Sequence, residues 1–114
     1  MTKTDFWSQL DVLVKESSII IDIPKGTINN SFPNGPSSFN YGHLENTSSM
    51  DNEDIDIYIG SDSNRIINAI ICTIDLIKRE SEIKILYGCN EKETNEIESI
   101  YNYFPSMRGL LVKH

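Results

Sequence analysis

At 114 residues, the chain is long enough for one domain with a small hydrophobic core, and we expect a single domain over residues 1–114. Its net charge of −7 disfavours nucleic acid and membrane surfaces as partners, because both require clustered Lys and Arg. No apolar run approaches the roughly 20 residues of a membrane span. The N-terminus lacks the apolar region of a signal peptide, so we expect a cytoplasmic protein.

Two elements are predicted before residue 25. Five apolar residues recur at helical spacing and predict an amphipathic helix over 5–15: Phe6, Trp7, Leu10, Leu13 and Val14. Residues 18–23 are rich in β-branched side chains and predict a strand, which Pro24 ends because it cannot donate to a ladder. Residues 25–38 predict a loop with a tight Asn-Gly-Pro turn at 34–36.

Three strands are predicted in the middle of the chain. Residues 55–59 alternate Ile with Asp56 and Tyr58, which places Asp56 and Tyr58 on one face of a half-buried strand. The nearly continuous apolar run of 66–77 predicts a long central strand. A short turn then leads into a third strand over 82–87.

The C-terminal quarter predicts a helix and a closing strand. Asn90 and Glu93 have the spacing of a capping box, and an apolar stripe continues the helix from there: Ile97, Ile100, Tyr101 and Phe104. Residues 108–113 predict the last strand. Because short consecutive strands favour antiparallel pairing, the predicted fold class is α+β, a small OB-like antiparallel β-barrel with a short N-terminal helix and a C-terminal helix.

The segment 40–56 carries the strongest chemical signal. It begins with an expected turn at Tyr41-Gly42 and ends in four carboxylates within six residues: Asp51, Glu53, Asp54 and Asp56. Like charges this close repel one another, and Mg²⁺, which prefers hard oxygen ligands, would offset the repulsion. A solvated acidic loop explains the same residues without a metal.

Asp75 lies inside the apolar run, where an unpaired charge would be costly. It therefore either faces a polar cavity with the other carboxylates or pairs with an Arg or Lys, and we favour the cavity. Cys72 lies in the same run and is expected in the core, since no neighbouring His indicates a catalytic thiol. Cys72 and Cys89 do not have the spacing of a zinc site.

Three segments resemble the soluble family I inorganic pyrophosphatases: Ile-Ile-Ile-Asp-Ile-Pro at 19–24, Asn-Tyr-Gly-His-Leu at 40–44 and Ser-Met-Asp-Asn-Glu-Asp-Ile-Asp-Ile at 49–57. That family has a strand ending in Glu-Ile-Pro or Asp-Arg-Pro, a Tyr-Gly-Tyr turn and an Asp-Gly-Asp-Pro-x-Asp signature. The resemblance extends over most of residues 18–113, and the chain looks like a shortened version of the family. It implies Mg²⁺-dependent hydrolysis of pyrophosphate or another small phosphoanhydride, with Mn²⁺ as an alternative metal, in a family that often forms oligomers.

The resemblance implies a role for each candidate site residue. Metal ligands are expected among five carboxylates: Asp51, Glu53, Asp56, Asp75 and Glu82. Asp75 stands about two residues before the family's position, and its place in this set rests on the expected cavity. Asp22 matches a position that contacts metal-bound water, and Glu53 stands where the family has the carboxylate that orients the attacking water. The expected catalytic set is Glu53, Asp56 and Lys84. Substrate contacts are expected from Lys25, Tyr41, Lys84 and Tyr103, and Arg108 is a further candidate cation.

The departures from the family pattern leave two other hypotheses open. Four family positions are changed, at Asn52, Asp54, His43 and Phe104, and the Arg expected before the Tyr-Gly turn is missing. Each charged hydrogen bond lost to the substrate costs roughly 1.5–3 kcal/mol. One alternative is therefore a degenerate pyrophosphatase-like module that binds metal and phosphate or a nucleotide without turnover. The other is a structural or interaction protein with an acidic loop.

Overall fold

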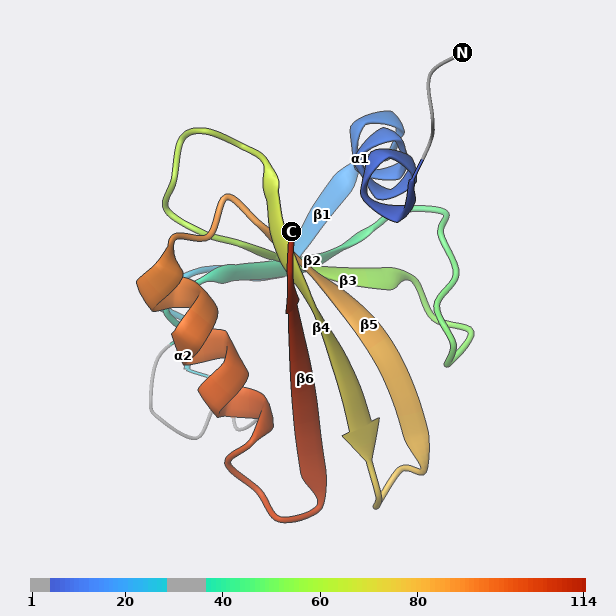
Figure 1. Cartoon of the computed structure of the whole chain (residues 1–114), viewed down its shortest axis with the longest axis vertical. Helices are drawn as coiled ribbons and strands as arrows, with labels where there is room; N and C mark the ends of the chain where they lie inside the picture. The colour runs from blue at the N-terminus through green and yellow to red at the C-terminus, as the bar shows by residue number, and fades with distance from the viewer. Residues whose placement is uncertain (1–4, 29–36) are drawn as a thin grey trace.

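A computed structural model of the chain describes residues 5–28 and 37–114. The elements follow one another as α1 (Phe6–Glu16), β1 (Ile19–Ile23), β2 (Asn40–Leu44), β3 (Ile55–Ile59), β4 (Ile67–Asp75), β5 (Glu80–Tyr87), α2 (Glu91–Tyr101) and β6 (Met107–Lys113) (Figure 1). The predicted α+β class is confirmed. The Asn-Gly-Pro turn predicted at 34–36 lies outside the described residues.

The six strands form one mixed sheet in the order β1-β2-β3-β5-β4-β6. Neighbouring strands are antiparallel except β3 and β5, which are parallel. The parallel pair arises because β5 returns from its hairpin with β4 into the position between β3 and β4. Among the described strands, β1 and β6 are the two edges of the sheet. The sheet is therefore open and mixed, and it is not the closed antiparallel barrel that the sequence predicted.

The turn predicted at Tyr41-Gly42 is instead part of strand β2, which lies between β1 and β3. Gly42 permits this placement because a Cβ atom there would lie 1.9 Å from the carbonyl oxygen of Ile20 on β1. The register of β1 against β2 shifts between Ile21 and Ile23, so Asp22 is the extra residue of a β-bulge. The bulge lies at a position predicted to be functional.

Each helix covers one face of the sheet. Val14 of α1 packs in a buried cluster with Leu44, Ile57, Ile67 and Ile85. Ile97 and Tyr101 of α2 pack in a second cluster that includes Tyr58, Ile71 and Leu86. Ile57 and Tyr58 thus point to opposite faces, as the alternation of 55–59 predicted. Asp56 shares the face of Tyr58, which is the α2 face of the sheet.

The predicted capping box opens α2: the Asn90 side chain accepts from the Glu93 N–H, and the Glu93 carboxylate accepts from the Asn90 N–H. The helix ends at Tyr101, three residues before the predicted stripe ends. Asn102 explains the earlier end, because its side chain donates to the carbonyl of Glu98 and pairs with the backbone of Gly109 on β6. Phe104 therefore lies beyond the helix.

Candidate functional site

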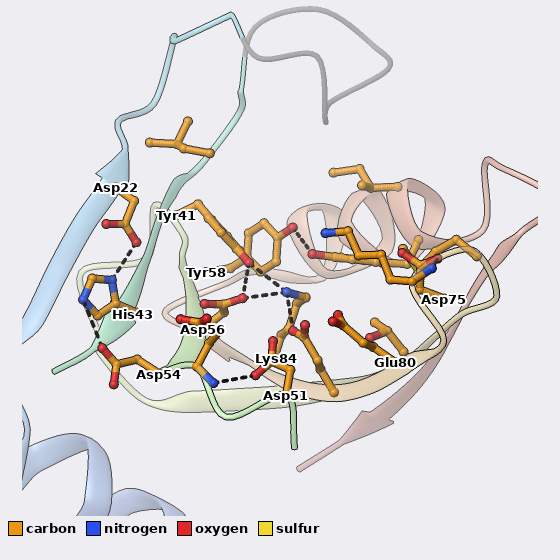
Figure 2. A pocket seen from close by; sticks show the side chains of 18 residues that line it. Asp22, Tyr41, His43, Asp51, Asp54, Asp56, Tyr58, Asp75, Glu80 and Lys84 are labelled. Atoms are coloured by element: carbon orange, nitrogen blue, oxygen red, sulfur yellow. Dashed lines mark hydrogen bonds and ion pairs between the residues drawn. The ribbon is translucent and has the colours of Figure 1, made fainter. Parts of the chain in front are cut away.

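A cavity of about 660 Å³ lies on the α2 face of the sheet (Figure 2). Eight of its 18 lining residues carry a carboxylate: Asp22, Asp51, Glu53, Asp54, Asp56, Asp75, Glu80 and Glu82. The cationic lining residues are Lys78 and Lys84, and His43 adds an imidazole. The cavity lining therefore carries a large excess of negative charge, which favours the binding of a cation in the cavity.

The cavity gathers eight of the ten site residues predicted from sequence: Asp22, Tyr41, Asp51, Glu53, Asp56, Asp75, Glu82 and Lys84. These residues come from β1 to β5 and from the loop before β3, so the tertiary fold brings together what the chain separates. Asp75 lies at the cavity, as the cost of burying a lone charge suggested.

Lys25 and Tyr103 do not line the cavity. Lys25 is exposed, and its backbone N–H donates to the side chain of Asn40. Tyr103 is 58% exposed and packs edge-on against Phe104, with ring centroids 5.0 Å apart. Arg108 is also outside, where its guanidinium donates to the carbonyls of Phe104 and Met107. The substrate roles predicted for Lys25 and Tyr103 therefore have no support from their positions.

Lys84 makes polar contacts with three other side chains that line the cavity. Its ammonium donates to Asp56 at 2.7 Å and to Tyr41 at 2.8 Å, and it lies 2.9 Å from Glu82. The Tyr41 hydroxyl in turn donates to Asp56 at 2.5 Å. Lys84 is only 8% exposed, so two carboxylates and a phenol share a nearly buried cation. Figure 2 shows the Lys84 side chain aimed between Asp56 and Tyr41.

The environment keeps Lys84 charged and Tyr41 neutral. Burial opposes the ammonium form of Lys84, but its contacts with Tyr41 and Asp56 outweigh burial, and the net effect raises the pKa of Lys84. Burial raises the pKa of Tyr41 strongly, and the Asp56 charge adds to this while Lys84 opposes it. Tyr41 therefore serves as a hydroxyl donor at neutral pH, and Lys84 as a fixed positive charge.

Tyr58 and Tyr101 form a buried phenol pair beneath Lys84. Their hydroxyl oxygens lie 2.5 Å apart, and the Lys84 ammonium lies 5.8 Å from the centroid of the Tyr101 ring. Burial raises the pKa of both phenols, so both remain neutral. The sequence assigned Tyr101 to the helix core. Because Tyr101 is far from the acidic segment in sequence, no local pattern indicated that Tyr101 would line the same cavity.

The carboxylate oxygens of Asp51, Glu80 and Glu82 lie within 4.8 Å of one another. Burial raises the pKa of Glu82, and its hydrogen bond with Asp51 adds to this while Lys84 opposes it. The same hydrogen bond, together with the Glu53 N–H, lowers the pKa of Asp51. A cation bound between the two carboxyl groups would offset the repulsion between their charges. Three hard oxygen donors suit Mg²⁺ or Mn²⁺.

This cluster shares Asp51 and Glu82 with the predicted metal ligands and adds Glu80. The other predicted ligands have different surroundings: Asp56 is bound to Lys84 and Tyr41, and Asp75 accepts from the backbone N–H groups of Ile77 and Lys78. Glu53 is exposed at the loop before β3. The sequence signal for Glu80 was its spacing of two residues from Glu82 and four from Lys84, which places all three on one face of β5.

His43 links two carboxylates on the other side of the cavity (Figure 2). Its Nδ1 lies 2.7 Å from Asp22 and its Nε2 lies 3.6 Å from Asp54. The hydrogen bond with Asp22 raises the pKa of His43; burial opposes this, and the charges of Asp22 and Asp54 add to it. The β-bulge at Asp22 thus brings a β1 carboxylate to a β2 imidazole.

Comparison of the sequence with protein-family models and with curated proteins finds no match. Comparison of the structure with solved structures also finds none.

Proposed function

We propose that this protein hydrolyses a small phosphoanhydride, with pyrophosphate as the favoured substrate, in a reaction that requires Mg²⁺ or Mn²⁺. Water adds to one phosphorus, the bridging P–O bond breaks, and two phosphate ions leave. The main support is that the Asp51, Glu80 and Glu82 cluster touches the Lys84 ammonium through Glu82. Oxygen donors for a divalent cation and a positive charge for phosphate thus share one cavity.

Each part of the site has a distinct role in this proposal. Asp51, Glu80 and Glu82 would hold the cation, which when bound neutralises phosphate charge and acidifies water. Lys84 supplies the positive charge for phosphoryl oxygens, and the Tyr41 hydroxyl, which accepts from Lys84 and donates to Asp56, holds both side chains at the cavity. The exposed Glu53 carboxylate at the cavity wall is the candidate for orienting the attacking water.

A second candidate function is a module that binds metal with phosphate or a nucleotide without turnover. One observation favours it: Lys84 is already bound by Asp56, Glu82 and Tyr41. Lys78 is the other lysine among the lining residues that the structure describes. A tetra-anionic substrate would then meet few free cations, and binding would depend mainly on the metal.

Phosphate release from pyrophosphate distinguishes the two functions. Wild-type protein is assayed with Mg²⁺, with Mn²⁺ and with EDTA, beside Asp51→Asn and a matched control, Asp62→Asn. Asp62 is an exposed aspartate outside the cavity, in the loop after β3. The proposal predicts metal-dependent release that Asp51→Asn lowers by at least about tenfold, since even loss of a group that only supports a metal ligand costs roughly 10–100-fold, and that Asp62→Asn preserves.

Release that is absent with both metals, or that Asp51→Asn leaves unchanged, contradicts hydrolysis at this site. In the first case, stabilisation of the protein by pyrophosphate together with Mg²⁺ identifies the binding module. The absence of any effect of metal or pyrophosphate on stability would leave only a structural role for the acidic loop.

We place this function in the cytoplasm. Cys72 and Cys89 are both free thiols, Cys89 buried and Cys72 partly exposed. Free thiols are typical of proteins in reducing compartments. Assays should therefore contain a reductant.

A further inference from the structure

Two loops lie side by side at one end of the molecule. Residues 76–79 join β4 to β5, and residues 102–106 join α2 to β6. The backbone N–H of Leu76 donates to the carbonyl of Ser106 at 2.9 Å, which holds the two loops together. Figure 1 shows both loops at the lower end of the long axis, away from α1.

Four large apolar side chains on these loops face solvent. Leu76 is 67% exposed, Ile77 79%, Tyr103 58% and Phe104 45%. Single exposed apolar residues are common, but a group of this size on adjoining loops marks an interaction surface. We call these four residues, with the cations Lys78, Arg79 and Arg108, the loop-tip surface.

The charge of the loop-tip surface is opposite to that of the whole chain. Residues 76–79 and 102–108 contain three of the ten Lys and Arg residues and neither Asp nor Glu, while Asp75 and Glu80, which flank the first loop, line the cavity together with Lys78. The net charge of −7, on which the expectation against a membrane partner rested, is an average over the whole chain and does not describe this local surface. Lys78, Arg79 and Arg108 are all exposed. The complementary partner is therefore anionic and also accepts apolar side chains.

A second copy of the chain fits this surface poorly. A two-fold contact places the same patch on itself, which would bring three cations against three cations. A protein groove would require one defined concave shape, whereas a bilayer interface accommodates protruding loop tips of any shape. Aromatic and aliphatic side chains at the headgroup level, flanked by Lys and Arg, are the chemistry of interfacial membrane binding.

We propose that the loop-tip surface docks the protein peripherally on anionic lipid bilayers. Leu76, Ile77, Tyr103 and Phe104 enter the boundary between headgroups and acyl chains, while Lys78, Arg79 and Arg108 contact lipid phosphates and carboxylates. Across the part of the chain that the structure describes, no helix has the length and apolarity that a membrane crossing requires. The proposed contact is made by the loop-tip surface, and it does not depend on the proposed hydrolysis.

Co-sedimentation with vesicles tests the proposal. Full-length protein is mixed with phosphatidylcholine vesicles and with vesicles of phosphatidylcholine and phosphatidylserine, at low and high salt. The test variant is Ile77→Ser with Arg79→Glu. The matched control is Ile28→Ser with Lys92→Glu, because Ile28 is 78% exposed and neither residue belongs to the two loops. All four positions are exposed, and circular dichroism verifies the fold.

Wild type and the control should bind the phosphatidylserine vesicles and lose binding at high salt, since surface electrostatics are screened. The test variant should bind at least about fivefold less, because it replaces a cation by an anion and removes an apolar contact. Absence of wild-type binding, or equal binding by the test variant, overturns the proposal. Sedimentation velocity without lipid provides a second test. A dimer of the wild type that only the test variant disrupts would also overturn the proposal, because the surface would then bind a second copy of the chain.

Discussion

At the scale of single residues, Lys84 is the group whose removal should affect stability most. Lys84→Met leaves the Asp56 and Glu82 carboxylates, only 26% and 17% exposed, without their shared cation. Breaking a largely buried ion pair from one side costs about 3 kcal/mol of unfolding free energy. Urea denaturation near neutral pH measures this loss.

Lys113→Met is the matched control for Lys84→Met. Lys113 pairs with Glu91 at 3.8 Å with both side chains well exposed, and such a pair contributes less than about 0.5 kcal/mol. Adding Asp56→Asn to Lys84→Met should recover part of the stability, because one unpaired charge is removed. Equal small losses in the two lysine variants would show that Lys84 is not held between carboxylates.

His43 should make stability depend on pH. Its hydrogen bond with Asp22 raises its pKa above 6.5 in the folded protein. Because the folded state favours the protonated ring, the stabilising contribution is complete below the unfolded pKa and is lost as the pH rises through the folded pKa. NMR titration should therefore place the His43 pKa above 6.5, and Asp22→Asn should bring it down. An unchanged pKa in Asp22→Asn contradicts the pairing.

Most site residues were predictable because they lie in short local patterns, whereas those that were missed depend on strand register or on the packing of a helix. Asp51 and Asp56 belong to one acidic segment that carries its own signal. Glu80 reaches the cluster because β5 begins two residues earlier than predicted, with Asp75 opposite Glu80. Tyr101 reaches Tyr58 only through the packing of α2 on the sheet, which no local pattern encodes.

At the scale of elements, the contact between β1 and β2 depends on one glycine. In Gly42→Ala, the new Cβ would meet the Ile20 carbonyl at 1.9 Å, so β1 must move away from β2. We expect a loss of at least about 2 kcal/mol in unfolding free energy. Hydrogen exchange should show faster exchange of β1 amides.

Gly26→Ala is the comparison for Gly42→Ala, because no atom lies within 4 Å of its added Cβ. Its cost comes from the positive φ of 90° at Gly26, which disfavours Ala locally. We expect β1 amides to stay protected in Gly26→Ala. Equal protection of β1 in both variants would show that the close approach at Gly42 does not hold the edge strand.

The elements were largely predictable, but their arrangement was not. The alternation at 55–59 and the apolar run at 66–77 predicted β3 and β4, because burial pattern is a local property. Strand β2 was missed because its central Gly42 reads as a turn in sequence. The parallel pairing of β3 with β5 was missed because strand order depends on where a hairpin returns, and periodicity carries no information on neighbours.

At the scale of the whole molecule, the net charge of −7 and the eight cavity carboxylates predict stabilisation by divalent cations. Mg²⁺ at tenfold its dissociation constant adds about 1.4 kcal/mol to the unfolding free energy, or roughly 6 °C in Tm for a domain of this size. NaCl at matched ionic strength should have a smaller effect. Differential scanning fluorimetry measures both, and an equal response to the two salts would indicate general screening only.

Both candidate functions require a divalent cation held by Asp51, Glu80 and Glu82, so the most direct measurement is paramagnetic broadening by Mn²⁺ in the ¹H–¹⁵N spectrum of the labelled protein. Substoichiometric Mn²⁺ should first broaden the amide signals of these three residues and spare α1 on the opposite face of the sheet. Asp51→Asn should weaken this effect. Broadening spread evenly over exposed carboxylates such as Glu91, unchanged in Asp51→Asn, would contradict a metal site in the cavity.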